Sequence, residues 1–224
     1  MQNATNHIKR ELQLTADGSH TLFIPEMDEH YHSVNGAVQE SRHVFIEAGL
    51  HHLERTEITV LEIGFGTGLN AFLTLLDAEA HQRKIHYYSV ELYPLDTDVI
   101  GSLNYGEMIC AGRKDVFLAL HQAEWNVPIP VTEFFELHKI QGDSNTCALP
   151  DRIDLVYFRC VRSRQATGDV EPGNLRPVVC PYDRRRGFDD LLCERRRPAY
   201  DERSRICCRK NTRPPWKARN ASCY

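Results

Sequence analysis

A glycine-rich turn between an apolar strand and a helix start constrains this chain more than any other feature. Residues 59–70 read Thr-Val-Leu-Glu-Ile-Gly-Phe-Gly-Thr-Gly-Leu-Asn. Gly64, Gly66 and Gly68 carry no Cβ atom, so the backbone can turn tightly and approach a ligand closely. The helix that follows points free N–H groups at whatever lies over the turn. This pattern predicts a nucleotide or nucleoside pocket at the carboxyl edge of a parallel sheet.

Strand and helix patterns alternate through the first 158 residues. Runs of β-formers predict strands at 60–63, 86–90, 134–140 and 154–158. Helical spacing of apolar residues predicts helices at 38–53, 69–80, 96–103 and 115–125. A turn signal, Asp-Gly-Ser at 17–19, predicts a hairpin over 12–23. The alternation implies an α/β fold with a Rossmann-like, doubly wound parallel sheet.

Charge and cysteine content divide the chain after residue 158. Residues 1–158 hold 10 Lys+Arg and 23 Asp+Glu, a net charge of −13, whereas residues 159–224 hold 17 and 8, a net charge of +9. Six of the eight cysteines and six prolines lie in 159–224, where no helical or strand period survives. We therefore expect an incomplete core domain over 1–158 and a poorly ordered Arg/Cys-rich tail over 159–224. The sheet would then lack its last strands and leave an unpaired, aggregation-prone edge.

Several classes of protein are disfavoured by composition. No apolar run approaches the roughly 18 residues of a membrane span, and the N-terminus lacks the build of a signal peptide, so we expect a cytoplasmic protein. The tail has no CxxC pair and no histidine, which disfavours a zinc site. Neither His30/His32 nor His51/His52 has an evident third ligand. We interpret these histidines as surface residues and expect no metal site.

Acidic residues around the turn suggest which ligand the pocket takes. Glu91, at the end of the next predicted strand, can accept both hydroxyls of a ribose, a device that NAD-binding folds share. Glu62 inside the first strand is costly to bury without a partner, and the ammonium of S-adenosylmethionine would supply one. The turn lacks the third glycine of the dinucleotide fingerprint. Asp143 could accept the adenine amino group. Alternatively, Glu91 is a solvated surface residue, Glu62 caps the glycine turn, and Asp143 is only a turn-forming residue.

Three segments resemble one bacterial tRNA-modification family. They are YHSVNGAVQESRHVF at 31–45, EIGFGTGLN at 62–70 and YSVELYPL at 88–95. These segments resemble the methyltransferase half of MnmC-type enzymes, including stand-alone relatives without the flavin oxidase half, and the resemblance covers about 14–158. It implies a class I methyltransferase that transfers a methyl group from S-adenosylmethionine to the amine of 5-aminomethyl-2-thiouridine at the tRNA wobble position. The partners implied are tRNA and a separate flavin oxidase acting on the same uridine.

The resemblance also implies roles for individual residues. Glu62, Gly64, Gly66 and Gly68 would form the cofactor loop, Glu91 would hold the ribose, and Asp143 would lie near the adenine. By the same resemblance, the methionine end or the pocket mouth would be bordered by Tyr31, Glu40, Ser41 and Arg42. For Tyr31 and Arg42, ordinary packing or a surface ion pair remains an alternative.

The family pattern breaks at Arg159. An Asp-(Gly/Ala)-Phe-Ala-Pro motif, which would accept the amine's proton, is expected where residues 159–163 read Arg-Cys-Val-Arg-Ser. Residues 158–164 permit the codons TTC CGA TGC GTT CGC TCC CGA, and removing one C yields Phe-Asp-Ala-Phe-Ala-Pro. The same offset restores family-like sequence in 190–204 and 212–222. We hypothesise a shifted reading frame, assign no catalytic residue, and expect little methyl transfer.

Three other functions remain open. The net charge of −13 over 1–158 favours a methyltransferase acting on a small molecule, because phosphate backbones attract Lys and Arg. An NAD-linked oxidoreductase would share the glycine turn and the ribose acid. The Arg-rich tail could be a nucleic-acid-binding arm.

Overall fold

The computed structural model describes residues 8–159 and 177–181, and the predictions for 160–176 and 182–224 lie outside the described residues. The larger of its two sheets has the strand order β6-β7-β5-β4-β8-β9. Its four central strands are parallel and are β4 (Glu57–Ile63), β5 (Lys84–Glu91), β7 (Phe135–Gln141) and β8 (Leu155–Arg159). Antiparallel strands lie at the two edges, β6 (Pro128–Thr132) and β9 (Pro177–Pro181). The predicted parallel α/β core is therefore present.

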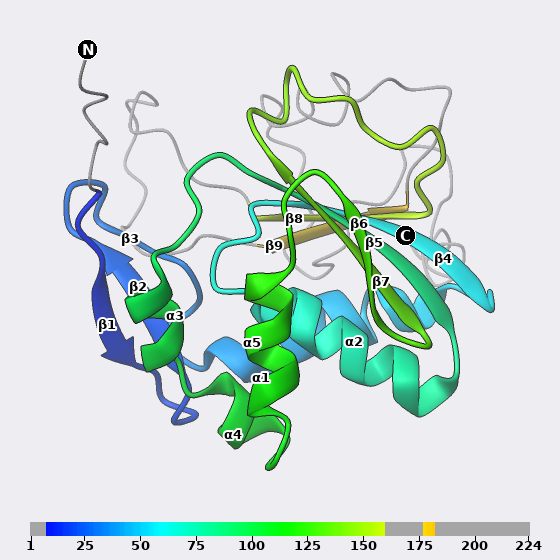
Figure 1. Ribbon diagram of the computed structural model, residues 1–224. Coiled ribbons are helices and arrows are strands. Elements are labelled where there is room, and N and C mark those ends of the chain that lie inside the picture. The colour runs from blue at the N-terminus through cyan, green and yellow to red at the C-terminus, as the bar shows by residue number, and fades with distance from the viewer. Residues whose placement is uncertain (1–7, 160–176, 182–224) are drawn as a thin grey trace, which may run out of the picture.

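Helices gather below this sheet in the view of Figure 1, beside a small antiparallel sheet. The helices are α1 (Ala37–Ser41), the π-helix η1 (Arg42–Glu47), the 3-10 helix η2 (Leu50–His52), α2 (Leu69–His81), α3 (Thr97–Ser102), α4 (Tyr105–Ile109) and α5 (Lys114–Gln122). The small sheet consists of β1 (Glu11–Leu14), β2 (His20–Ile24) and β3 (Glu29–His30). The predicted hairpin is β1–β2, and β3 extends it.

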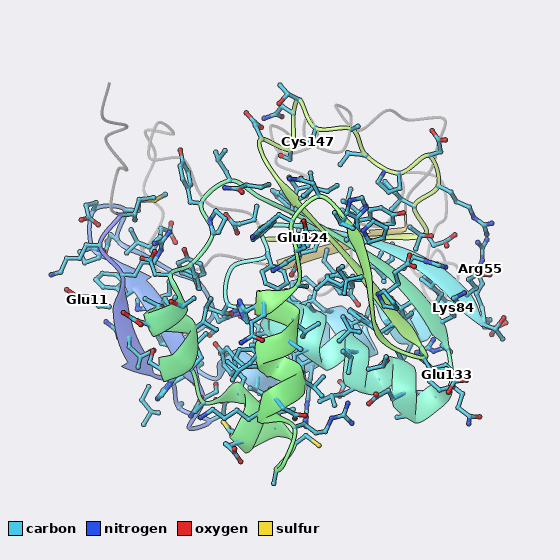
Figure 2. The ribbon with its side chains drawn as sticks, in the orientation of Figure 1. Glu11, Arg55, Lys84, Glu124, Glu133 and Cys147 are labelled. Atoms are coloured by element: carbon cyan, nitrogen blue, oxygen red, sulfur yellow. The ribbon has the colours of Figure 1, made fainter. Side chains whose placement is uncertain are left out.

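The main core lies between the sheet and helices α2 and α5. Alternate strand residues such as Val60 and Tyr87 are fully buried against Phe72 of α2 and Phe117 of α5, whose rings meet edge to face at 5.5 Å. A smaller cluster on the opposite face combines strand residues with the loop that carries Cys147 (Figure 2). The period-2 pattern of the strands therefore selects the helix-covered face.

Several predicted elements need correction. The single helix predicted over 38–53 is three short pieces, α1, η1 and η2, and α4 was not predicted. Strand β6 was not predicted either, because Pro128 and Pro130 disfavour a strand. An edge position tolerates these prolines, since one side of an edge strand needs no ladder hydrogen bonds. These errors arise where tertiary packing overrides local preference.

The expectation of an unpaired edge at β8 is wrong. Strand β9 pairs with it antiparallel over five residue pairs, from Leu155 opposite Pro181 to Arg159 opposite Pro177. A strand within the tail, where no strand was expected from the sequence, thus covers the backbone edge of β8.

Candidate nucleoside-binding site

A cavity of about 200 Å³ opens at the carboxyl ends of β4 and β5. Its lining includes the glycine turn after β4, Glu62 and Glu91 from the strand ends, Tyr31 and His32 after β3, and Tyr157 and Phe158 of β8. Ligand pockets usually measure about 300–1,000 Å³, so a nucleoside-sized ligand would fill this cavity and extend beyond its mouth. The predicted pocket position, at the edge of the sheet over the turn, agrees with this cavity.

The glycines of the turn are required by both conformation and space. Gly66 and Gly68 adopt φ values of 51° and 70°, which side chains rarely tolerate. A Cβ atom on Gly66 would lie 3.1 Å from Cδ1 of Tyr31, and one on Gly68 would lie 2.7 Å from Nε2 of His121. The turn therefore fits between two side chains that come from distant parts of the chain.

Glu91 borders the cavity from the end of β5. Its Oε2 accepts a hydrogen bond from the Gly66 N–H (2.9 Å), and its Oε1 accepts one from the Tyr93 N–H (2.8 Å). Both bonds fix the carboxylate beside the glycine turn. A diol placed over the turn would meet an acceptor that is already oriented.

Glu62 is a buried carboxyl group at the base of the cavity, only 2% exposed. Its Oε1 accepts from Asn70 Nδ2 (3.1 Å) and its Oε2 accepts from Ser89 Oγ (2.8 Å). Burial raises the pKa of Glu62 to about 8, although the bonds from Ser89 and Asn70 act in the opposite direction. The group is mostly protonated at neutral pH, and a cationic ligand group would favour its ionised form.

Asn70 is a site residue that sequence reasoning placed in the turn motif without giving it a role. Its Oδ1 is buried and has no hydrogen-bond partner among the described residues, while its Nδ2 serves Glu62. A buried acceptor without a donor is costly unless a ligand completes it. An ammonium group beside Glu62 would supply the missing donor, so the residues present fit the amino-acid end of S-adenosylmethionine.

Tyr31 and His32 lie against the glycine turn, and His32 is not the surface residue that the sequence suggested. His32 is 7% exposed, its Nε2 is 2.7 Å from Thr67 Oγ1, and its Nδ1 is 3.5 Å from Ser41 Oγ. The Tyr31 hydroxyl accepts from Arg10 Nε (3.1 Å), and burial raises the Tyr31 pKa. The segment after β3 therefore holds the turn from outside.

The remaining predicted residues lie outside the lining of the cavity. Ser41 is buried behind His32, and Arg42 is exposed at the start of η1. Asp143 is exposed, and its Oδ1 accepts from the N–H (2.8 Å) and Nδ2 (2.7 Å) of Asn145, as in a turn. Its neighbour Gly142 donates its N–H to the Glu91 carbonyl (3.0 Å), so Asp143 still follows the correct strand end.

A layer behind the turn was not predicted from sequence. Burial lowers the pKa of His121 to about 4, so its neutral ring donates Nε2–H to the Thr67 carbonyl (3.1 Å). Lys139 Nζ donates to the His121 carbonyl and lies 4.5 Å from the centroid of the Trp125 ring. Because these partners come from α5, β7 and the segment between them, no local pattern could have revealed them.

The parallel sheet, the glycine turn after β4 and the acidic residue at the end of β5 together form the Rossmann-like fold of class I S-adenosylmethionine-dependent methyltransferases. Among the described residues, no helix combines the length and apolar character needed to cross a membrane.

No protein-family model matches the chain. It is 40% identical over 101 residues, 42% of its length, to the "tRNA 5-methylaminomethyl-2-thiouridine biosynthesis bifunctional protein MnmC" of Magnetococcus marinus, covering 15% of that protein. The protein of the same name from Cupriavidus necator is 28% identical over 142 residues, 61% of this chain and 20% of the relative. The crystal structure of MnmC2 from Aquifex aeolicus matches with a TM-score of 0.57 and 23% identity, over 70% of this chain and 52% of that one.

These matches support an MnmC-type methyltransferase domain, as the resemblance of the three sequence segments predicted. The alignments to the two MnmC relatives span only 15% and 20% of the relatives' own length. The name of these relatives places them in tRNA 5-methylaminomethyl-2-thiouridine biosynthesis, and the solved structure supports the fold of this chain.

Proposed function

We propose that this chain binds S-adenosylmethionine in the cavity over the glycine turn and is built to methylate the amine of 5-aminomethyl-2-thiouridine at the tRNA wobble position. The observation that carries the proposal is the buried Glu62 carboxyl group at the base of the cavity beside the half-buried Asn70, whose buried Oδ1 has no donor among residues 8–159 and 177–181. The similarity to MnmC proteins supports the choice of substrate.

Different residues would bind different parts of the cofactor. Glu62 and Asn70 would receive the ammonium of the methionine part, and Glu91 would accept the ribose hydroxyls. Tyr31 would close the side of the pocket, since its Cδ1 lies 3.1 Å from the place that a Cβ atom on Gly66 would occupy. Asp143 would approach the adenine only if its loop changed its present turn. S-adenosylmethionine supplies a methyl group already activated on a sulfonium.

The protein's contribution to the reaction would then be alignment. An amine, a methyl carbon and a sulfur atom must lie in line, and orientation of this kind accounts for a large part of catalysis in such transfers. The attacking amine must also lose a proton. Because position 159 is Arg where the family motif has Asp, we propose that the chain binds the cofactor but transfers methyl groups slowly.

Calorimetry with S-adenosylhomocysteine and NADH tests the cofactor. The proposal requires heat from S-adenosylhomocysteine with a stoichiometry of one, and stronger binding than that of NADH. The reverse preference in a folded protein would favour the oxidoreductase. If neither ligand produces binding heat, the proposal is wrong.

A radiolabel assay tests the substrate. We expect little transfer of labelled methyl to undermethylated tRNA by this chain, and clear transfer by a version whose reading frame is corrected after residue 158. Normal turnover by the 224-residue chain would contradict the proposed defect. Transfer by neither version, with intact cofactor binding, would favour a small-molecule methyltransferase. The net charge of −13 over residues 1–158 supports that second candidate, since a tRNA backbone is attracted by positive charge.

A separate flavin oxidase acting on the same uridine would supply the aminomethyl group. The two enzymes need not bind each other, because each need only bind the same tRNA.

A further inference from the structure

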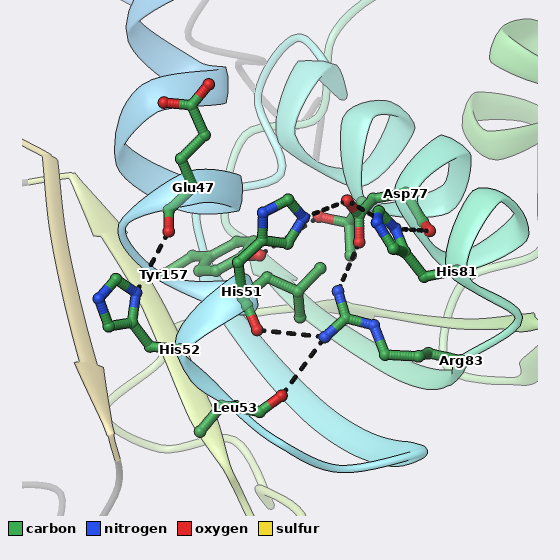
Figure 3. A network of polar contacts seen from close by, with 10 residues as sticks. Glu47, His51, His52, Leu53, Asp77, His81, Arg83 and Tyr157 are labelled. Atoms are coloured by element: carbon green, nitrogen blue, oxygen red, sulfur yellow. Dashed lines mark hydrogen bonds and ion pairs between the residues drawn. The ribbon is translucent and has the colours of Figure 1, made fainter.

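Three side chains with metal-binding atoms converge at the far end of α2, away from the cavity (Figure 3). Asp77 and His81 lie on α2 and His51 comes from η2, with one ligand atom of each within 4.8 Å of the others. His51 Nε2 lies 2.6 Å from Asp77 Oδ2, and His81 Nδ1 lies 3.3 Å from the same oxygen. The expectation that His51 lacks converging ligands is therefore wrong.

The scaffold around these side chains is rigid. Asp77 and His81 are four residues apart on one helix and so share a face. Arg83 Nη2 donates to Asp77 Oδ1 (2.7 Å), and Arg83 Nη1 donates to the carbonyls of Leu50 (3.3 Å) and Leu53 (3.4 Å). Arg83 thus fixes one carboxylate oxygen, turns Oδ2 toward the imidazoles and ties the η2 segment to the site.

Burial and exposure are arranged as in an open metal site. The Asp77 side chain is 8% exposed, whereas those of His51 and His81 are 39% and 52% exposed. The two imidazole rings meet at an angle of 67° with centroids 5.1 Å apart. A cation arriving from solvent could reach all three ligands while keeping water in its remaining positions.

We propose that His51, Asp77 and His81 bind a divalent cation of borderline softness, with Zn²⁺ the best suited. Two imidazoles favour Zn²⁺, Ni²⁺ or Cu²⁺ over Mg²⁺ or Ca²⁺, which prefer oxygen ligands. Two histidines and one carboxylate are a known zinc ligand set that leaves a coordination position open.

The present hydrogen bonds define what the cation must replace. Carboxylate and carbonyl oxygens only accept, so His51 Nε2 donates to Asp77 Oδ2 (2.6 Å) and His81 Nδ1 donates to the backbone carbonyl of Asp77 (3.0 Å). On binding, the nitrogen of each ring that faces the cation would present a lone pair, with the ring N–H on the other nitrogen. Ligand atoms at about 2.0–2.1 Å from a tetrahedral ion lie about 3.3 Å apart. The His81–Asp77 pair already has this separation, whereas the His51–Asp77 pair must widen.

Arg83 limits the affinity. The positive charge of its guanidinium, which is bound to Asp77 Oδ1, repels the incoming metal ion. The metal ion should therefore bind more weakly than at a closed structural zinc site. The bound ion would connect η2 to α2 and stabilise the folded chain by mass action.

Calorimetry with ZnCl₂ on the full 224-residue chain tests the proposal. The thiols are first blocked with iodoacetamide, because the eight cysteines would compete for zinc. We expect one zinc ion per chain. His51→Ala and His81→Ala should each weaken binding by at least about tenfold, as even outer-shell changes do at metal sites. His52→Ala is the matched control, since this exposed neighbour contacts the Glu47 carbonyl and not Asp77. MgCl₂ should produce no binding heat.

Cobalt spectroscopy supplies a second measurement that does not depend on a variant. Co²⁺ added to the blocked wild-type chain should produce visible ligand-field bands, which excess Zn²⁺ abolishes. Circular dichroism checks that each variant is folded, and His51→Gln replaces any alanine variant that is not. Absence of zinc heat and cobalt bands in the wild type, or zinc affinity in folded His51 and His81 variants equal to that of His52→Ala, would overturn the proposal.

Discussion

Helix α2 carries a different kind of polar cluster at each of its ends. At its N-terminus, the half-buried Asn70 meets Glu62 of β4, which is buried and has its pKa raised to about 8, and the buried Asn70 Oδ1 has no partner among the described residues. Near its C-terminus, Asp77 has partners on both oxygens, and the histidines beside it are half exposed. The first cluster stays incomplete until a ligand arrives, whereas a ligand at the second must displace existing bonds. Substitutions around the first cluster should therefore test binding of a ligand over the glycine turn, and those at the second should test binding of a cation.

The largest expected effect comes from the turn that begins α2. Gly68→Ala places a Cβ atom 2.7 Å from His121 Nε2 in a backbone with φ of 70°. We expect a loss of about 2–3 kcal/mol in the free energy of unfolding, measured by urea denaturation. Gly101→Ala in α3 is the control, because no atom lies within 4 Å of its added Cβ. It should be neutral or stabilising by up to about 1 kcal/mol. Equal effects of the two substitutions would contradict the steric role of the turn.

The buried acid should make stability depend on pH. The folded-state pKa of Glu62 is about 8 against an ordinary value of 4.5, so the folded state binds the proton more tightly than the unfolded state. This contribution to stability is complete below about pH 4.5 and is lost as pH rises toward 8, by at most about 1.4 kcal/mol per unit. Urea denaturation at several pH values measures this pH dependence of the free energy of unfolding. In Glu62→Gln this part of the slope should vanish; an unchanged slope would show that Glu62 is not its source.

The same acid should control cofactor affinity. If an ammonium group binds beside Glu62, the carboxyl must release a proton, so S-adenosylhomocysteine should bind more tightly as pH rises from about 6 to about 7.5. Calorimetry in buffers of different ionisation enthalpy detects the released proton. Binding with no proton release would place the ammonium elsewhere.

A smaller effect is expected at the acceptor that lacks a partner. Asn70→Ala should weaken S-adenosylhomocysteine binding by about tenfold, because one hydrogen bond to a charged group contributes about 1.5–3 kcal/mol. Calorimetry at fixed pH measures it. Asn145→Ala, at an exposed turn, is the matched control and should bind normally. Unchanged affinity in Asn70→Ala would mean that water, not ligand, completes the acceptor.

The smallest effect is expected at Asp143, outside the lining of the cavity. Asp143→Ala should cost under about 1 kcal/mol in stability through the lost turn bond and should lower affinity by less than about threefold. A loss as large as that of Asn70→Ala would show that the loop rearranges and that the adenine role implied by the family resemblance is correct.

The glycine turn and the cavity over it were predictable because their signals are contiguous in sequence. The strand, the three glycines and the helix start occupy one segment, and Glu91 follows the next strand at the position that a parallel sheet demands. Apolar residues at period 2 selected the face of β4 and β5 that packs on α2. Short pieces such as η1, η2 and β6 were not predictable, since their local preferences are weak and packing decides them.

By itself, the sequence determined the parallel core and the turn with Glu62 and Glu91 around it, since each depends on periodicity or on glycine conformation within a few residues. Only the tertiary structure decided which distant side chains complete these features. His32 reaches Thr67 across 35 positions, His51 reaches Asp77 across 26, and β9 pairs with β8. Such contacts depend on how helices and strands pack, and packing is set by the shape of the whole core, which no local pattern of residues specifies.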